Sequence, residues 1–371
     1  MRIGIDARLI EETGVGRYIR NLLAELALLN TDHEFVIFLT AKNFTSFSLP
    51  SPKWKKVLAD VRWHTVSEQL LLPGIFIREH LDILHIPYHN PPIFYPGKLV
   101  VTIHDLTILH FSTGKATTLP KPLYYLKRLG YTYELSVGLK LASHILTVSN
   151  ATKRELIDHF PISSDKISVI YEGVDPHLLT AKSMETAKRK IPESYFLAVG
   201  NAYPHKNLEI LLEGYATYKT HTKKPSRLVL VGSNDLFYKR LKIYAQSLGI
   251  LDDVTFFGPA DDQSLINLYS HAVAFIFPSL MEGFGLPALE ALSLHCPVIV
   301  SNISVFHEIL GEFATYIDPH NAGSVSVALL QAEDKKLPVH SREEVRAFLS
   351  HYSWQNLAKE TLAIYERSAR I

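Results

Sequence analysis

Strand-like and helix-like segments alternate along almost the whole of this 371-residue chain, and this alternation restricts its fold more than any other feature. Short runs rich in Val, Ile, Leu and Phe have the length and composition of buried strands. Segments with helical periodicity lie between most of them. Strands that alternate with helices form parallel sheets covered by helices on both faces. We therefore expect an α/β protein built from doubly wound sheets.

The expected strands form two series. The first comprises Arg2–Asp6, Glu34–Thr40, Ile83–Ile86, Leu99–Ile103, His144–Val148 and Ile167–Tyr171. The second comprises Tyr195–Val199, Arg227–Val231, Val254–Phe257, Ala274–Phe277, Pro297–Ser301 and Ala314–Ile317. The clearest helical patterns are Gly16–Leu29, Tyr124–Ala142, Ala151–Phe160, Asn207–Tyr218, Leu236–Ser247, Asp262–His271 and Ala288–Leu294.

One polar stretch of mixed charge, 176–192, interrupts the pattern and predicts a linker. It separates an N-terminal domain, 1–175, from a C-terminal domain, 193–350. The final segment, Glu343–Ile371, reads as helical, and we expect residues 351–371 to pack back on the N-terminal domain. Two such sheets facing each other form a cleft, and ligands of these folds bind at the carboxyl ends of the strands.

The composition excludes several classes of protein. The 38 Lys and Arg residues balance 37 Asp and Glu, which argues against a nucleic-acid partner. The single cysteine, Cys296, excludes an internal disulfide and is expected to be inert core. The N-terminus, Met1–Asp6, reads as a strand rather than a signal peptide, and no apolar run approaches the roughly 18 residues of a membrane span. These features predict a cytoplasmic protein.

The segment Ser-Leu-Met-Glu-Gly-Phe-Gly-Leu-Pro-Ala-Leu-Glu, Ser279–Glu290, follows an expected strand and opens an expected helix. Gly283 and Gly285 leave its backbone without Cβ atoms, and Pro287 suits the first helical position. Backbone amides at such a helix N-terminus favour a phosphate group. An ordinary strand–turn–helix with solvated glutamates is the competing interpretation.

Within this segment, Glu282 and Glu290 are separated by seven residues. The pattern resembles the signature of the retaining glycosyltransferases grouped as family 4, whose GT-B architecture has two Rossmann-like domains facing across a cleft. The resemblance implies that Glu282 lies beside the transferred sugar and that Glu290 binds the ribose. It also implies that the amides of Phe284, Gly285 and Leu286 meet the sugar or the diphosphate.

Two N-terminal segments extend the resemblance. In Thr13-Gly-Val-Gly-Arg17, the residues Gly14, Gly16 and Arg17 correspond to a loop near the donor phosphate. Taken alone, the two glycines also fit an ordinary turn before a helix, because the third glycine of a dinucleotide fingerprint is missing. In Ile103-His-Asp-Leu106, His104 corresponds to a histidine that contacts the transferred hexose.

The second domain opens with Val-Gly-Asn-Ala-Tyr-Pro-His-Lys-Asn, in which Lys206 corresponds to a lysine that binds the donor diphosphate. Asn201 stands where many relatives carry an arginine, so either Lys206 bears more of the anion or Arg17 contributes. Contacts to the base are expected from the backbone around Gly258.

Two further positions depart from the family pattern. Glu172 replaces the usual asparagine, so no hydrogen-bonding role is transferred to it. His295 replaces a glycine after a helix, so we expect a structural residue at positive φ, which histidine tolerates better than most residues.

Four histidines, His85, His89, His104 and His110, raise the question of a metal site. Pro87 lies between the first two and predicts a loop rather than a helix that presents two ligands. GT-B enzymes need no metal for their chemistry, so we expect none, and no cofactor beside the nucleoside diphosphate sugar that is the substrate.

Basic and aromatic residues cluster at Lys53–Lys56 and near the start of the helix expected at Tyr124–Ala142. The second cluster contains Lys121, Tyr124, Tyr125, Lys127 and Arg128. Either cluster fits a solvated helix face or a peripheral contact with the inner membrane.

The resemblance implies transfer of a hexose, with retention, from a sugar nucleotide to a hydroxyl of a glycan or lipid-linked oligosaccharide. His104, Glu282 and Lys206 are the expected catalytic residues, GDP-mannose is the first candidate donor, and UDP-hexoses are the alternative. A sugar-nucleotide epimerase or isomerase on the same scaffold and an inactive binding subunit are the competing functions.

Overall fold

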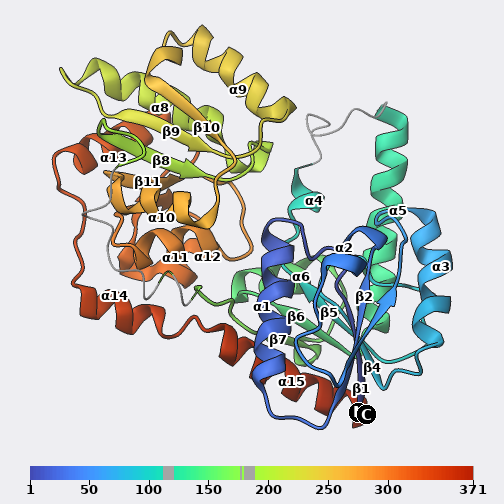
Figure 1. Cartoon of the computed structure of the whole chain (residues 1–371). Coiled ribbons are helices and arrows are strands. Elements are labelled where there is room, and N and C mark those ends of the chain that lie inside the picture. The colour runs from blue at the N-terminus through green and yellow to red at the C-terminus, as the bar shows by residue number, and fades with distance from the viewer. Residues whose placement is uncertain (112–120, 176–177, 179–188, 371) are drawn as a thin grey trace. The chain divides into compact units, whose positions relative to one another are not determined.

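The computed structural model describes residues 1–111, 121–175, 178 and 189–370. The chain forms two compact units, each built around its own parallel sheet (Figure 1). Unit 1 comprises Met1–Leu109, Thr117–Gly173 and Tyr352–Ile371, and unit 2 comprises His110–Ala116 and Val174–His351. Most of the predicted linker, 176–192, lies outside the described residues. The expected α/β class with two Rossmann-like sheets is confirmed.

Unit 1 has a seven-stranded parallel sheet of order β3-β2-β1-β4-β5-β6-β7. Its strands are β1 (Arg2–Asp6), β2 (Glu34–Leu39), β3 (Trp54–Leu58), β4 (Ile83–Ile86), β5 (Leu99–Ile103), β6 (His144–Thr147) and β7 (Ile167–Val169). The chain runs outward from β1 to β3, returns to β4, and then runs outward the other way. This reversal places a topological switch point between β1 and β4.

Strand β3 was not expected from the sequence. The structure corrects the interpretation of Lys53–Lys56 as a solvated helix face, because these residues lead into an edge strand instead. Trp54 is buried against Phe35, with ring centroids 4.6 Å apart. Lys55 pairs with Glu79 at 2.7 Å. Lysines on an edge strand are a common way to prevent strand addition, and the adjacent Lys55 and Lys56 hid the strand signal here.

The helices of the first half are α1 (Gly14–Leu28), α2 (Ala41–Ser46), α3 (Val66–Ile77), α4 (Thr107–His110), α5 (Lys121–Leu141) and α6 (Asn150–His159). Right-handed crossovers place the helices that follow β1 and β2 on one face of the sheet and those that follow β3, β5 and β6 on the other. Helix α3 therefore lies beside α5, and the Gln69 Nε2 atom of α3 donates to Glu134 of α5 at 2.8 Å.

The C-terminal segment, which was expected to be helical, forms two helices: α14 (Arg342–Leu349) in unit 2 and α15 (Trp354–Arg370) in unit 1. Helix α15 packs against α1 (Figure 1). The Tyr365 hydroxyl contacts His85 Nδ1 at 2.6 Å inside unit 1. The last helix is therefore part of the core of unit 1.

Unit 2 has a six-stranded parallel sheet of order β10-β9-β8-β11-β12-β13. Its strands are β8 (Tyr195–Val199), β9 (Arg227–Val231), β10 (Val254–Gly258), β11 (Ala274–Phe277), β12 (Val298–Ser301) and β13 (Thr315–Ile317). Its helices, besides α14, are α8 (Leu208–Thr220), α9 (Leu236–Ser247), α10 (Asp262–His271), α11 (Leu286–Ser293), α12 (Ser304–Leu310) and α13 (Ala322–Glu333). Here the switch point lies between β8 and β11.

Among the described residues, no helix combines the length and the apolar character that a membrane span requires. Cys296 is buried, and burial raises the pKa of its thiol to about 12, which agrees with an inert core residue. His295 has φ = 58°, as its position in place of a glycine predicted.

Candidate functional site

The switch point of unit 2 brings two predicted residues together. Strands β8 and β11 are neighbours, and the loops that follow them carry Lys206 and Glu282. The Nζ atom of Lys206 lies 2.6 Å from the Glu282 carboxylate, and both side chains are mostly buried. The same ammonium lies 5.2 Å from the centre of the Phe277 ring. A lysine and a glutamate far apart in sequence thus form one partly desolvated ion pair at the carboxyl edge of the sheet.

Asn207, to which the sequence analysis gave no role, holds this edge together. Its side-chain Nδ2 atom donates to the carbonyl of Pro278 at 3.1 Å and to that of Pro319 at 2.7 Å. It adopts the left-handed conformation at φ = 57° and precedes α8 directly. The amide of Leu280 also donates to the carbonyl of His205 at 2.7 Å. Lys206 and the glutamate loop are therefore fixed to each other through backbone contacts as well as through their charges.

The glycine-rich segment turns sharply into α11. Gly285 has φ = 108°, and a Cβ atom there would lie 2.9 Å from the Phe306 ring, so only glycine fits. Helix α11 begins at Leu286, which places Pro287 at its second position rather than at the first one expected. Phe284 and Glu290 are both buried, and Glu290 lies one turn inside the helix. The helix N-terminus offers backbone amides of the kind that phosphates favour.

Three glycines follow three adjacent strands of unit 2. Gly258 ends β10 with φ = 84°, and its carbonyl accepts from the amide of Gly232 at 3.1 Å. A Cβ atom at Gly232 would lie 2.3 Å from the carbonyl oxygen of Gly200. Asn201, half-buried, follows Gly200 directly. The backbone is therefore densely packed at the edge where Gly258 was expected to meet the base.

In unit 1, His104 follows β5 and has partners at both ring nitrogens. Its Nδ1 atom lies 3.3 Å from the Glu172 carboxylate, and its Nε2 atom lies 3.1 Å from the carbonyl oxygen of Pro87. Glu172 is buried. Tyr18 of α1 contacts the His104 ring edge-on, with centroids 4.9 Å apart. The structure thus gives Glu172 a role that the sequence analysis did not assign to it, because the contact depends on the fold.

The predicted glycine loop lies inside the first turn of α1, which begins at Gly14 rather than at Gly16. A Cβ atom at Gly14 would meet nothing within 4 Å, whereas one at Gly16 would lie 2.6 Å from the carbonyl oxygen of Ile10. Gly16 is therefore required by packing. The side chain of Thr13 does not cap the helix. Tyr18 of the same helix contacts His104, and Arg17, half-buried, lies between Gly16 and Tyr18 in sequence.

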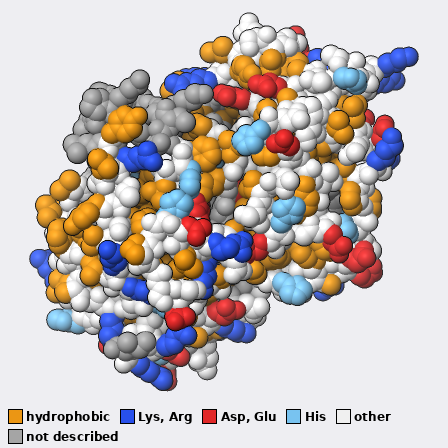
Figure 2. All heavy atoms as spheres, turned by 180° about the vertical axis from the view of Figure 1, so that it is seen from behind, with side chains coloured by type: hydrophobic (Ala, Val, Ile, Leu, Met, Phe, Trp, Pro, Cys, Tyr) orange, Lys and Arg blue, Asp and Glu red, His pale blue; other side chains and the backbone are white. Residues whose placement is uncertain are grey.

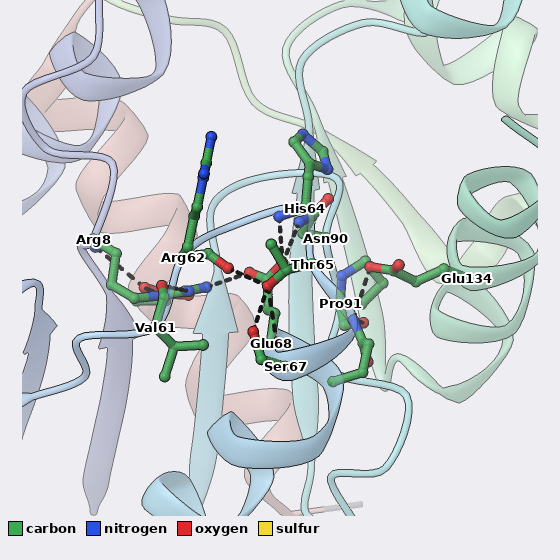
Figure 3. A network of polar contacts seen from close by, with 12 residues as sticks. Arg8, Val61, Arg62, His64, Thr65, Ser67, Glu68, Asn90, Pro91 and Glu134 are labelled. Atoms are coloured by element: carbon green, nitrogen blue, oxygen red, sulfur yellow. Dashed lines mark hydrogen bonds and ion pairs between the residues drawn. The ribbon is translucent and has the colours of Figure 1, made fainter. Parts of the chain in front are cut away.

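A buried ionic network stabilises the carboxyl edge of the first sheet (Figure 3). Arg8 donates to Asp6 at 2.7 Å and to Glu68 at 2.6 Å. Glu68 also accepts from the amide of His64 at 2.7 Å and from Asn90 at 2.8 Å. Burial disfavours the Arg8 charge, but the two carboxylates outweigh it and raise the pKa. Three loops, those after β1, β3 and β4, are thereby tied to one point.

Aromatic rings cluster on the loops that this network stabilises. Trp63 and Tyr88 meet at 6.2 Å between centroids, and Tyr88 lies 3.7 Å from His89. His89 also faces the edge of Tyr131 at 5.3 Å. Burial and the neighbouring His64 lower the pKa of His89 to about 3. The Trp63 side chain is exposed, so this cluster offers a flat apolar surface beside polar rings.

His85, raised above as a metal-ligand candidate, serves the core instead. Its Nε2 atom contacts Thr102 at 2.7 Å and its Nδ1 atom contacts Tyr365 at 2.6 Å. Burial lowers its pKa to about 3. Both nitrogens are therefore occupied, and the ring is neutral.

Unit 2 also contains a depression of about 580 Å³ at the carboxyl ends of β12 and β13. Asn302, Asp318 and His320 line it, together with Leu280 of the Glu282 loop. No motif in the sequence marked these three polar residues, because Asn302 follows β12 whereas Asp318 and His320 follow β13, and the two loops meet only in the sheet.

Two family models match the chain and together span most of it. "Glycosyltransferase Family 4" matches residues 13–178, and "Glycosyl transferases group 1" matches residues 182–347.

Two curated relatives and one solved structure are similar to this chain over most of its length. O-antigen chain mannosyltransferase RfbU of Salmonella typhimurium is 28% identical over 295 residues, covering 80% of this chain and 76% of the relative. O-antigen chain mannosyltransferase B of Escherichia coli is 27% identical over 382 residues, covering 95% and 96%. The structure of sucrose-phosphate synthase from Thermosynechococcus elongatus has a TM-score of 0.79 at 18% identity, covering 99% and 98%.

Proposed function

Because this chain belongs to the GT-B glycosyltransferases of the family 4 kind, we propose that it transfers a hexose, with retention, from a nucleoside diphosphate sugar. The proposed acceptor is a hydroxyl of a glycan or lipid-linked oligosaccharide. The single observation that carries the proposal is the Lys206–Glu282 ion pair at the switch point of unit 2. Two relatives named as mannosyltransferases support GDP-mannose as the first donor, and UDP-hexoses are the alternative.

The proposal assigns the donor diphosphate to Lys206 and to the backbone amides of Phe284, Gly285 and Leu286 at the start of α11. The Lys206 ammonium offsets charge that develops on the leaving diphosphate. Each charge-assisted contact of this kind contributes about 1.5–3 kcal/mol. Glu282 accepts from hydroxyls of the transferred sugar, and Glu290, one helical turn later, accepts from the ribose.

In unit 1, Arg17 and the first turn of α1, with Gly14 and Gly16, supply further cationic and amide groups for the donor phosphate. In this proposal these groups compensate for Asn201, which stands where many relatives carry an arginine. Asn201 can donate a hydrogen bond to a phosphate but carries no charge.

For the chemical step we propose attack on the same face from which the diphosphate leaves. The bond from the anomeric carbon to the diphosphate oxygen breaks, and a bond to the acceptor oxygen forms. The acceptor proton passes to the departing diphosphate. Glu282 is a poor candidate for a covalent nucleophile because its carboxylate is ion-paired with Lys206. Catalysis then consists of positioning and of charge stabilisation, and it requires no metal ion.

The proposal assigns the acceptor to unit 1. His104 is held by Glu172 and Pro87 at the end of β5, so its ring is fixed before any substrate binds. Exposed Trp63 and its neighbour Tyr88 provide the flat apolar surface against which a sugar ring packs.

Kinetics of site variants test the assignment. Lys206→Ala and Glu282→Ala should each nearly abolish transfer, while the protein still folds. Lys219→Ala, which removes a lysine of unit 2 that pairs with Asp253, is the matched control and should retain full activity. Full activity in either site variant would refute the roles of the ion pair.

Product analysis tests the reaction itself. Each donor is incubated with and without acceptor, and the anomeric configuration of the product is read by NMR. Transfer requires the acceptor, whereas epimerisation of the donor does not. An inverted anomeric centre would refute retention, and a donor altered without acceptor would favour an epimerase. A thermal-shift comparison of GDP, UDP and ADP identifies the base, because stabilisation follows the ligand concentration relative to Kd.

A further inference from the structure

Helix α3 carries large apolar side chains on both its buried and its exposed side, yet it lies on the surface of unit 1. Its inward side buries Leu72, Pro73 and Phe76. Its outward side exposes Val66 by 77% and Leu70 by 65%. A soluble surface helix normally has a polar outer face, and a helix that is apolar all round is normally enclosed. The outer face of α3 therefore lacks the polar character that is usual for the solvent-exposed face of a helix.

The exposed residues of α3 form a stripe. Leu70 and Ile77 follow Val66 by four and eleven positions, about one and three helical turns, so the three side chains lie above one another. Leu71, also exposed, widens the stripe. A single exposed leucine on a protein surface needs no explanation, but a row of large aliphatic side chains on one helix does.

Helix α5 continues the same apolar face. Tyr125, Leu129 and Tyr133 are spaced four residues apart and are all exposed, with Leu129 at 69%. The two helices lie side by side, because Gln69 of α3 donates to Glu134 of α5.

The segment after β4 joins this face as well. Gln69 accepts from the amide of Ile93 at 2.9 Å, and the next residue, Phe94, is 62% exposed. In Figure 2 hydrophobic side chains gather at the left edge, over α3 and α5. We call this surface the α3–α5 face, and it comprises Val66, Leu70, Leu71, Ile77, Phe94, Tyr125, Leu129 and Tyr133.

Exposed cations border the α3–α5 face. Of the acidic residues that follow α3, Glu79 is paired with Arg2 and Lys55, whereas Asp82 is exposed. Arg62 before α3, Arg78 at its end and Lys140 on α5 are exposed. The only acidic residue of α3 is Glu68, which is buried in the Arg8 network. The only acidic residue in the α5 sequence is Glu134, half-buried beneath Gln69. A face with exposed aliphatic and tyrosine side chains, cations at its borders and no exposed carboxylate on either described helix is complementary to anionic lipid.

We infer that the α3–α5 face is a docking surface for a membrane that contains anionic lipid. The two helices lie flat on the bilayer and insert their aliphatic side chains among the acyl chains, with the tyrosines and cations at the level of the head groups. This location replaces Lys53–Lys56, whose Trp54 is buried and whose Lys55 is paired with Glu79. Of the second cluster suggested by the sequence, Tyr125 belongs to the face, whereas the side chains of Lys121, Tyr124 and Lys127 lie outside the described residues.

The inference deepens the proposed function and rests on it for its purpose, since a lipid-linked acceptor is reached at a membrane surface. The loop that carries Trp63 leads directly into α3, whose N-terminus Thr65 caps by accepting from the amide of Glu68 at 3.3 Å. A docked α3 would therefore place the acceptor loops next to the head groups.

Flotation of the full chain with vesicles tests the inference. Vesicles of phosphatidylcholine alone are compared with vesicles that also contain phosphatidylglycerol. The variant Leu70→Glu with Leu129→Glu places a charge on each helix of the face. The matched control, Ile243→Glu with Val327→Glu, changes two exposed aliphatic residues on α9 and α13 of unit 2. All four positions are exposed, so thermal unfolding should be unchanged.

The wild-type chain and the control should float with the anionic vesicles. The double variant on the face should lose about a hundredfold in partition coefficient, roughly tenfold for each leucine that no longer inserts. Arg78→Gln with Lys140→Gln should abolish most of the preference for anionic over neutral vesicles, about fivefold per cation.

Three results would overturn the inference. The wild-type chain could remain with the dense fraction in both vesicle preparations. The Leu70→Glu, Leu129→Glu variant could float as well as the wild type. Sedimentation could show a dimer of the wild type that this variant dissociates, without flotation, which would make the face an interface between two copies. Transfer to a water-soluble acceptor, measured without lipid, reports separately on the proposed function, because the face variants leave Lys206, Glu282 and His104 unchanged.

Discussion

Removal of the negative charge at Glu282 should tighten the binding of a free nucleoside diphosphate, although it should abolish sugar transfer. The Glu282 carboxylate lies 2.6 Å from Lys206 Nζ and is 12% exposed. A diphosphate that binds to the same ammonium from another direction would lie roughly 5 Å from this carboxylate. Two like charges at that separation repel by about 3 kcal/mol at an effective dielectric constant of about 20.

Salt and partial exposure reduce this repulsion to about 1–2 kcal/mol, or about five- to thirtyfold in Kd. Glu282→Gln keeps the size of the side chain and its ability to accept a hydrogen bond from Lys206, so the ammonium stays in place. The Kd of GDP or UDP should therefore fall by about this factor. Lys206→Gln should raise the Kd by about tenfold or more, because it removes the charge-assisted contact.

Calorimetric titration of both nucleotides measures these changes. Asp253→Asn, which neutralises the partner of Lys219 in the same unit, is the control and should leave the Kd unchanged. If Glu282→Gln binds nucleotide as weakly as Lys206→Gln, the carboxylate orients the lysine and does not compete with phosphate. That result would refute the reasoning, because it would mean that the pair acts as one positioned unit.

Three further results are expected. Glu172→Gln should lower kcat roughly tenfold and leave the nucleotide Kd unchanged, because it removes the charged partner of His104 Nδ1; unchanged kinetics would show that Pro87 and Tyr18 suffice to hold the ring. Gly285→Ala should destabilise the protein by about 2–4 kcal/mol in urea unfolding, because an alanine is strained at φ = 108° and meets Phe306. Gly14→Ala, whose added Cβ atom meets no neighbour, should change stability by less than about 1 kcal/mol. Similar values for both variants would contradict the strain at Gly285. Burial raises the pKa of Glu134 from 4.5 to about 7, so the folded protein keeps a proton that the unfolded chain releases, and stability is lost as the pH rises through this window. Glu134→Gln should therefore be more stable than the wild type by about 1–2 kcal/mol near pH 8 and equal to it near pH 4, as denaturant titrations at both pH values can check.

The sequence alone determined the class of fold and most of the strands. Buried strands such as Ile83–Ile86 and Ala274–Phe277 carry their signal locally, because a strand covered on both faces must be apolar throughout. The turn before α11 could also be predicted from its glycines, since Gly285 adopts a conformation that other residues rarely reach. His295 could be placed at positive φ for the same local reason.

Elements with weaker local signals were missed. Strand β3 carries the adjacent lysines Lys55 and Lys56 at the edge of its sheet, so it shows neither the continuous apolar run nor the strict alternation that marks a strand in sequence.

Contacts between residues distant in sequence were decided only by the tertiary structure. Lys206 meets Glu282, and His104 meets Glu172, because parallel strands bring the loops after them to one edge whatever their separation along the chain. The α3–α5 face has the same origin: the sequence shows that α3 is apolar, but only packing decides which of its apolar residues are buried. Side-chain identity is local information, whereas burial and partnership depend on what the rest of the chain places opposite each residue.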